Sequence, residues 1–202
     1  MTDNFERFRP FMQLPEEEGG DAYYVIELIR RGKDCPYLTA ANYHFKNYYI
    51  DTLKKYDRVQ DEIRTICRAL RLRAYASVNR KSFRQVTMNT IAEMSRRAAL
   101  NDFRRPYAVF NSCSGKFTDK DDKHWVVDID DYEWRTVCYI EHLLNECSPE
   151  GRKVELMLPT RIGVHLITKP FDIGEFQLIL KEAGRQVPEI KKNHLTLLFE
   201  DL

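Results

Sequence analysis

The chain has 202 residues, of which 43% are hydrophobic and 31% charged, and its 32 Lys and Arg against 31 Asp and Glu leave a formal net charge of +1. This length and composition are typical of a globular protein with room for a sizeable core. The balanced charge excludes a protein that attracts nucleic acid or membranes through its overall charge, so a local patch would have to recognise such a partner.

The cysteines and the N-terminal segment bear on the cellular compartment. The five cysteines are scattered and contain no CxxC pair, which argues against a zinc ribbon or a disulfide framework and favours a reducing compartment. The N-terminal segment carries charges where a signal peptide needs an apolar run, and no window approaches the roughly 20 apolar residues of a membrane span. We therefore expect a cytoplasmic protein without a membrane partner.

The first third of the chain predicts a helical N-terminal region over residues 1–70. Asp21 is the expected N-cap of a helix over residues 22–34, which has a glycine near its end. The segment 37–71 predicts one or two further helices, because its apolar residues are spaced for one buried face.

From residue 71 onward the pattern changes to strands that alternate with helices. The expected order is strand, helix, strand, helix, hairpin, helix and strand, which predicts an α+β protein. The expected strands cover residues 71–79, 124–131, 153–158, 164–168 and 194–199, and the expected helices cover residues 82–99, 132–145 and 173–183, with a polar loop over residues 111–123.

The strand over residues 124–131, HWVVDIDD, ends in a pair of carboxylates. Alternate side chains of an extended strand share a face, so Asp128 and Asp130 point the same way. Neighbouring carboxylates at the end of an apolar strand repel each other and are costly to desolvate, which favours a divalent cation such as Mg²⁺ or Mn²⁺ between them. The alternative is a strand that ends in a solvated acidic turn.

Two further stretches carry matching chemistry. Residues 160–165 combine a hydroxyl, a guanidinium, a turn glycine and an imidazole in one expected hairpin, and the last expected strand runs into Glu200 and Asp201. Carboxylates that hold a metal, Arg and His that donate to phosphate oxygens, and a glycine that admits the backbone are the parts of phosphoryl or nucleotidyl transfer.

In this order, the VVDID strand, the T-R-x-G-x-H hairpin and the hydrophobic strand ending in an acid resemble the catalytic core of the archaeo-eukaryotic primase superfamily. The resemblance covers residues 71–202 and implies a primase-polymerase-like mixed sheet core behind the helical region. It implies a nucleoside triphosphate bound with Mg²⁺ or Mn²⁺, and a chain started or extended on a DNA or RNA template. The implied catalytic and metal-binding residues are Asp128, Asp130 and Glu200, with Asp201 as the alternative to Glu200, and the implied nucleotide-binding residues are Thr160, Arg161, Gly163 and His165.

A basic run with interleaved aromatic residues is the best candidate for a template or primer track, because phosphates attract clustered cations and bases stack on aromatic rings. The alternative is the solvated face of a half-exposed strand. Two further arginine pairs, at 96–97 and 104–105, would extend the track if the fold brings them to the same side. The residues of the track are Arg71, Arg73, Arg80, Lys81 and Arg84, with Tyr75 and Phe83 between them.

The leading hypothesis is a metal-dependent nucleotidyltransferase of primase or polymerase type. A non-catalytic nucleic-acid or nucleotide-binding module on the same fold and a metal-dependent nuclease are the alternatives. In the first two cases, the N-terminal region would fit a segment that recruits a helicase or a second subunit. The sequence contains no P-loop, nucleophile elbow, HExxH motif or dinucleotide fingerprint, so ATPase, hydrolase, metalloprotease and dehydrogenase functions have no support.

Overall fold

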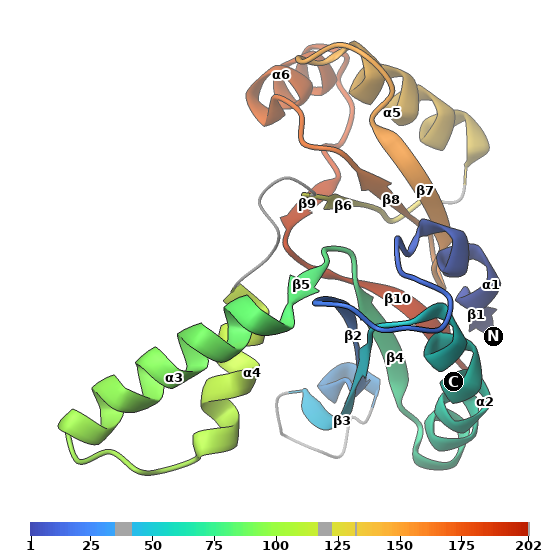
Figure 1. Ribbon diagram of the computed structural model, residues 1–202. Coiled ribbons are helices and arrows are strands. Elements are labelled where there is room, and N and C mark those ends of the chain that lie inside the picture. The colour runs from blue at the N-terminus through green and yellow to red at the C-terminus, as the bar shows by residue number, and fades with distance from the viewer. Residues whose placement is uncertain (35–41, 117–122, 132, 202) are drawn as a thin grey trace.

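The computed structural model describes residues 1–34, 42–116, 123–131 and 133–201 and has an α+β architecture built on two antiparallel sheets. Figure 1 shows the two sheets one above the other, with a helical hairpin that extends from the lower one. None of the helices in these ranges is long and apolar enough to cross a membrane.

The first sheet has six strands in the order β1-β10-β4-β2-β3, with β5 paired to β2 beside this path, and each pair is antiparallel. Helix α2 packs on one face, against Tyr24 and Ile26 of β2, and helices α3 and α4 pack on the other face, against Tyr23 and Val25. The strands are β1 Thr2–Asp3, β2 Ala22–Arg30, β3 Tyr43–Ile50, β4 Arg73–Ser77, β5 Lys81–Ser82 and β10 Leu195–Glu200, and the helices are α1 Phe5–Phe8, α2 Leu53–Leu70, α3 Phe83–Ala99 and α4 Pro106–Lys116.

Strand β2, near the centre of this sheet, shows that the predicted helix over residues 22–34 is wrong. Helices cover both faces of β2, so its sequence is a nearly continuous apolar run instead of an alternating one. Periodicity alone does not distinguish such a run from a buried helix. Asp21, the expected cap of that helix, instead accepts a hydrogen bond at 2.6 Å from the backbone N–H of Arg84, in the first turn of α3.

The region over residues 1–70 also differs from the prediction. Of the expected helical segment 37–71, residues 43–50 form β3 and only α2 is helical, while residues 37–41 lie outside the described part. Because β2 pairs with β4, the expected division after residue 70 falls inside one sheet.

The predicted loop over residues 111–123 is likewise wrong up to residue 116, which ends α4, and residues 117–122 lie outside the described part.

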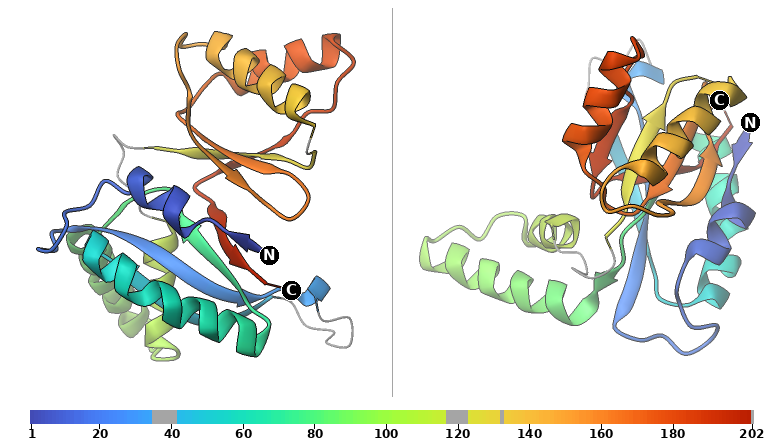
Figure 2. Two further views of the ribbon diagram at one scale, coloured as in Figure 1. Left: turned by 90° about the vertical axis from the view of Figure 1, so that its right-hand side faces the viewer. Right: turned by 90° about the horizontal axis from the view of Figure 1, so that it is seen from above.

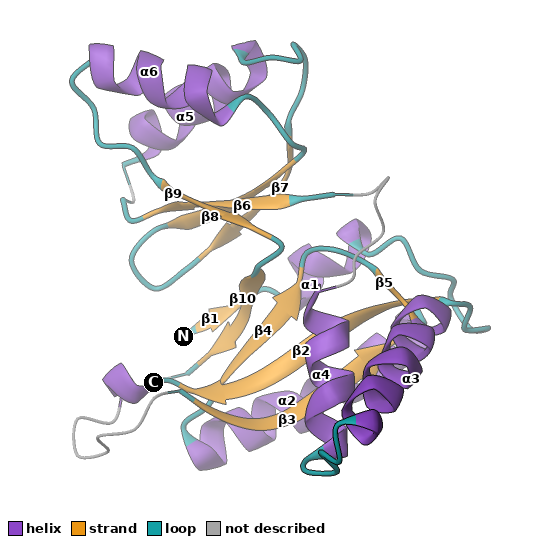
Figure 3. Cartoon of the chain, turned by 90° about the vertical axis from the view of Figure 1, so that its left-hand side faces the viewer, coloured by secondary structure: helices purple, strands orange, loops and turns teal. Residues whose placement is uncertain are grey.

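The second sheet follows the order β6-α5-β7-β8-α6-β9, with the strands side by side as β7-β8-β6-β9, which is the ferredoxin-like arrangement. Its pairs are all antiparallel, so neither sheet is the expected mixed one. Helices α5 and α6 cover one face of this sheet, and the opposite face turns toward the first sheet (Figure 3). The elements are β6 Trp125–Ile129, α5 Trp134–Glu146, β7 Val154–Pro159, β8 Val164–Thr168, α6 Ile173–Glu182 and β9 Glu189–Lys192.

The two sheets share a core and are joined by buried polar side chains. Val126 and Ile167 of the second sheet belong to the same apolar cluster as Phe5 and α2. Asn4 donates from Nδ2 to the carbonyl oxygens of Pro159 and Leu197, at 2.9 and 3.0 Å. Such buried bonds fix one half against the other, because breaking one leaves a polar group without a partner. Figure 2 shows α1 between the two halves.

Candidate functional site

Asp128 lies near the end of β6 and faces the first sheet, because its two neighbours in the strand pack under α5 and α6. His165 is its register partner on the adjacent strand β8. Oδ1 of Asp128 lies 3.3 Å from Nε2 of His165, and Oδ2 accepts a hydrogen bond from Nζ of Lys191 at 2.6 Å. The fold therefore brings the acid strand and the histidine of the hairpin into direct contact.

The imidazole of His165 is positioned by both sheets. It is only 9% exposed, and its Nδ1 lies 2.9 Å from the hydroxyl of Thr196, at the start of β10. An ionised carboxylate only accepts, so Nε2 carries the proton toward Asp128, and Nδ1 of a neutral ring accepts from Thr196. A proton donor is thus held beside the carboxylate in a fixed orientation.

The charges at Asp128 are balanced by a lysine. Burial by itself would raise the pKa of Asp128, but the hydrogen bonds from His165 and Lys191 outweigh burial and hold that pKa well below its usual range. Burial acts to lower the pKa of Lys191, and the bond to Asp128 more than offsets it, so this pKa is raised. The carboxylate is therefore ionised at neutral pH, and an ammonium stands where a metal cation would approach it.

The turn between β7 and β8 lies against the end of β6. The backbone N–H of Thr160 donates to the carbonyl of Gly163 at 2.8 Å, and the backbone N–H of Gly163 donates to the Thr160 hydroxyl at 3.1 Å. A Cβ added to Gly163 would lie 1.8 Å from the carbonyl oxygen of Ile129, so only glycine permits this approach. Arg161, at the tip of the turn, keeps 64% of its side chain exposed.

Asp130 follows β6 directly and is exposed. It lines, together with Asp128, a cavity of about 400 Å³ between the start of α5 and the loop before β9. Ile140 and Leu180 contribute an apolar part of the wall, and Arg185 contributes a cation. This volume lies in the range of small-molecule sites, so the acid pair borders a space in which a ligand fits.

Glu200, the third implied metal ligand, contacts an arginine of the first sheet instead of Asp128 and Asp130. It is 3% exposed at the end of β10, and its Oε2 lies 2.9 Å from Nη1 of Arg73. Arg73 also donates two hydrogen bonds to Asp34, at 2.8 and 2.6 Å. The alternative acid, Asp201, forms a partly exposed ion pair with Arg68. Within the described ranges no three His, Cys, Asp or Glu side chains are grouped to hold a metal, so the three implied carboxylates do not form one cluster.

The donor set that remains is the pair Asp128 and Asp130. Mg²⁺ sites typically use one or two protein carboxylates and complete the shell with water and phosphate oxygens. The pair would therefore fit a divalent cation that binds together with a phosphate ligand and displaces Lys191 from Asp128, and it does not fit a site closed by protein side chains.

The predicted basic track does not form one surface. Arg73 is 6% exposed between Asp34 and Glu200, and Lys81 is 5% exposed. Arg71 is exposed at the C-cap of α2, whereas Arg84 is exposed at the start of α3, and strand β4 lies between them in the chain. The alternation predicts an exposed basic face, and this prediction is wrong for Arg73 and Lys81, which the fold buries.

The sequence analysis missed two residues of the site. Lys191 lies on β9, a strand of four residues whose apolar content is too low to have predicted it. Thr196 lies in a predicted strand, but its contact with His165 joins β10 of the first sheet to β8 of the second sheet. The sequence does not indicate this contact between the two sheets. Comparison of the chain with family models, with curated proteins and with solved structures finds no significant match.

Proposed function

We propose that this protein is a metal-dependent nucleotidyltransferase of the primase or polymerase type, which acts on a nucleic-acid template with nucleoside triphosphates. The observation that carries the proposal is the contact between Asp128 and His165 on adjacent strands, beside a cavity that both Asp128 and Asp130 line. His165 does not line that cavity but contacts Asp128, which does, so the acids of one motif and the imidazole of the other meet at one carboxylate.

The proposed roles follow from the surroundings of each residue. Asp128 and Asp130 would hold Mg²⁺ or Mn²⁺, which when bound neutralises phosphate charge and stabilises the leaving group. His165, whose Nδ1 is held by Thr196, would turn its Nε2 hydrogen bond from Asp128 to a phosphate oxygen when a triphosphate binds. Arg161 is exposed at the edge of the turn and forms a long ion pair, with its Nη1 4.0 Å from Oε1 of Glu200, so it could turn toward a phosphate.

A calorimetric titration of a nucleoside triphosphate with Mn²⁺ present tests this proposal. The wild type should bind, and Asp128→Ala and Asp130→Ala should each lose binding and template-directed incorporation. Glu150→Gln is the matched control, because Glu150 is an exposed acid that does not line this cavity. Retained incorporation in both alanine variants, with folding unchanged by circular dichroism, would contradict the proposal.

A second candidate is a non-catalytic nucleotide or nucleic-acid binding module. The ion pairs of Lys191 with Asp128 and of Arg73 with Glu200 favour it, because each carboxylate already has a protein cation. This candidate predicts triphosphate binding without product in a primer-extension assay with either metal. Degradation of the oligonucleotide with metal but without triphosphates would instead indicate a nuclease.

A further inference from the structure

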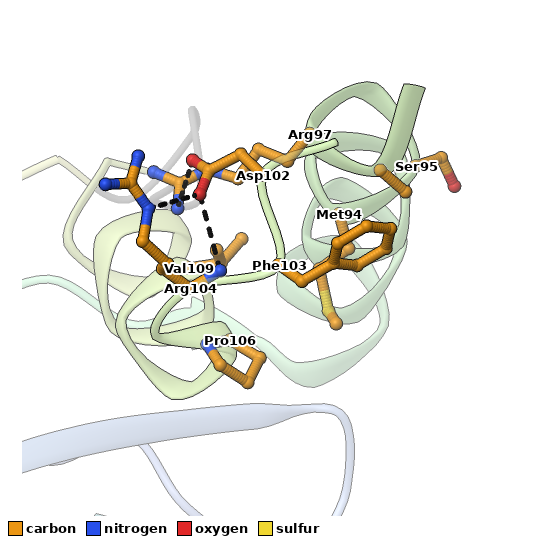
Figure 4. Close-up of a pocket in the computed structure, with 9 residues that line it drawn as sticks. Met94, Ser95, Arg97, Asp102, Phe103, Arg104, Pro106 and Val109 are labelled. Atoms are coloured by element: carbon orange, nitrogen blue, oxygen red, sulfur yellow. Dashed lines mark hydrogen bonds and ion pairs between the residues drawn. The ribbon is translucent and has the colours of Figure 1, made fainter. Parts of the chain in front are cut away.

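Helices α3 and α4 form a hairpin that projects from the first sheet (Figures 1 and 2). At its tip a cavity of about 440 Å³ opens between the helices and the loop that connects them. Figure 4 shows Phe103 and Met94 on one side of this cavity, Val109 and Arg104 on the other side, and Pro106 below them. The cavity is therefore apolar inside and basic at its edge.

The hairpin is the basic part of a nearly neutral chain. Residues 83–116 contain six Lys and Arg and only two acids, whereas the whole chain has a formal charge of +1, so the remainder is net negative. One acid, Asp102, holds arginines at the rim: Arg104 Nε lies 3.0 Å and Arg97 Nη1 lies 3.8 Å from its carboxylate. At the tip itself, four arginines, at 96–97 and 104–105, stand against two acids, Glu93 and Asp102, and this surplus of cations attracts a polyanion.

Two aromatic rings lie beside these cations in open contact with solvent. Phe103 is 73% exposed and Tyr107 is 70% exposed, and the Arg104 side chain is 88% exposed. A protein that binds single strands without reading sequence combines cations that follow the backbone with aromatic rings on which bases stack. Bases of a duplex are already stacked, so exposed rings at an apolar cavity favour an unpaired strand over a duplex.

We propose that the α3–α4 tip binds single-stranded nucleic acid, with a base in the cavity against Phe103 and the neighbouring phosphates at Arg104 and Arg105. This inference deepens the proposed function, on which it rests, because it assigns the template to a surface outside the acid pair. The charge decides between occupants: a second copy of the same hairpin would bring two basic surfaces together.

The test is fluorescence anisotropy of a labelled oligothymidylate of about 20 nucleotides, titrated with the full chain at several salt concentrations. Arg104→Gln with Arg105→Gln should weaken binding roughly tenfold and reduce the slope of log affinity against log salt by about 1.4. Phe103→Ala should weaken binding by a similar factor and leave the salt slope unchanged, because a stacking contact releases no counterions.

The matched control is Lys54→Gln with Arg58→Gln on α2, which removes the same net charge from two exposed residues away from the hairpin. Equal weakening in the control and in the tip variants would overturn the proposal, as would tighter binding of a duplex of the same length. No binding by the wild type, or a dimer that Phe103→Ala dissociates without any effect of oligonucleotide, would also overturn it.

The same variants separate this inference from the proposed function. The tip variants should still bind a triphosphate with Mn²⁺, and Asp128→Ala should still bind the oligonucleotide. Loss of oligonucleotide binding in Asp128→Ala together with unchanged binding in the tip variants would place the strand at the acid pair and overturn the inference alone.

Discussion

Gly163 shows how one missing side chain positions the hairpin at the site. Its Cα approaches the backbone of Ile129 so closely that a Cβ would meet the carbonyl oxygen at 1.8 Å. The turn residues Thr160 and Arg161 depend on that approach, because they precede the glycine in the same tight turn. A glycine that the sequence analysis associated with phosphate thus has a steric role against β6 in this fold.

Gly163→Ala should therefore destabilise the protein by roughly 1–3 kcal/mol and weaken triphosphate binding, since the turn has to move away from β6. Urea unfolding and calorimetric titration measure the two effects. Gly115→Ala is the control, because an added Cβ there meets no atom within 4 Å. Unchanged stability of Gly163→Ala would show that the turn relaxes without cost.

Lys81 is a buried lysine whose charge the fold disfavours. It is 5% exposed, lies 3.3 Å from the Oδ1 atom of Asn193 and has no ion pair among the described residues. Burial lowers the pKa of Lys81 to about 8, against a smaller opposing effect of the Glu27 carboxylate. In the unfolded chain a lysine has a pKa near 10.4, so between these values the unfolded state binds more protons.

The free energy of unfolding should therefore rise with pH from about 8 to about 10.4 through Lys81. At pH 7 the buried ammonium costs on the order of 3 kcal/mol, so Lys81→Met should be more stable than the wild type there. The advantage should shrink as the pH approaches 10.4. Urea unfolding of both proteins at several pH values measures it, and a difference independent of pH would contradict the assignment.

Strand β9 places a lysine beside the acid pair. It is short, lies at the edge of the second sheet, and brings Lys191 against Asp128 and Glu189, at 2.6 and 2.9 Å from its Nζ. A lysine in this position neutralises the carboxylate in the absence of another cation. It would therefore compete with a divalent metal, if one binds there, for the same oxygen atoms.

Lys191→Met should bind Mn²⁺ more tightly than the wild type, by roughly tenfold, because removing an ammonium from hydrogen-bond distance frees a carboxylate oxygen and one unit of opposing charge. Electron paramagnetic resonance of free Mn²⁺ measures the affinity. Lys192→Met, its neighbour in the same strand, is the control. Weaker Mn²⁺ binding in Lys191→Met would show that the lysine supports the site instead of competing for it.

At the scale of the whole molecule, β10 joins the two halves. Its first part contacts His165 through Thr196, and its last residue, Glu200, balances the buried Arg73 in the first sheet. Arg73 also forms a bidentate bond with Asp34, which does not involve Glu200. Glu200, the implied third metal ligand, is thus part of a buried ion-pair network with Arg73 and Asp34.

Glu200→Gln should lower the free energy of unfolding by roughly 1–3 kcal/mol, less than the loss of an only partner because Asp34 still faces Arg73. Asp201→Asn, which loses a partly exposed pair with Arg68, should cost less than about 1 kcal/mol. Mn²⁺ affinity should stay unchanged in Glu200→Gln. Loss of Mn²⁺ binding with unchanged stability would instead make Glu200 a metal ligand.

The sequence by itself determined the elements whose pattern is local. The hairpin of β7 and β8, helices α3 and α6 and the strand of the acid pair follow from alternation, caps and helical spacing. The sequence grouped Asp128 and His165 only through the chemistry and the family resemblance of their motifs, and the register of β6 with β8 brings the two side chains together.

Only the tertiary structure decided which faces are buried and which charges meet. The sequence of β2 predicts a helix because helices cover both faces of the strand, which makes its apolar run continuous. The sequence around Arg73 predicts an exposed side chain because its partners, Asp34 and Glu200, lie far away in the sequence. Lys191 reaches Asp128 through a strand without an apolar pattern. Burial and ion pairing depend on contacts between distant segments, so local periodicity does not encode them.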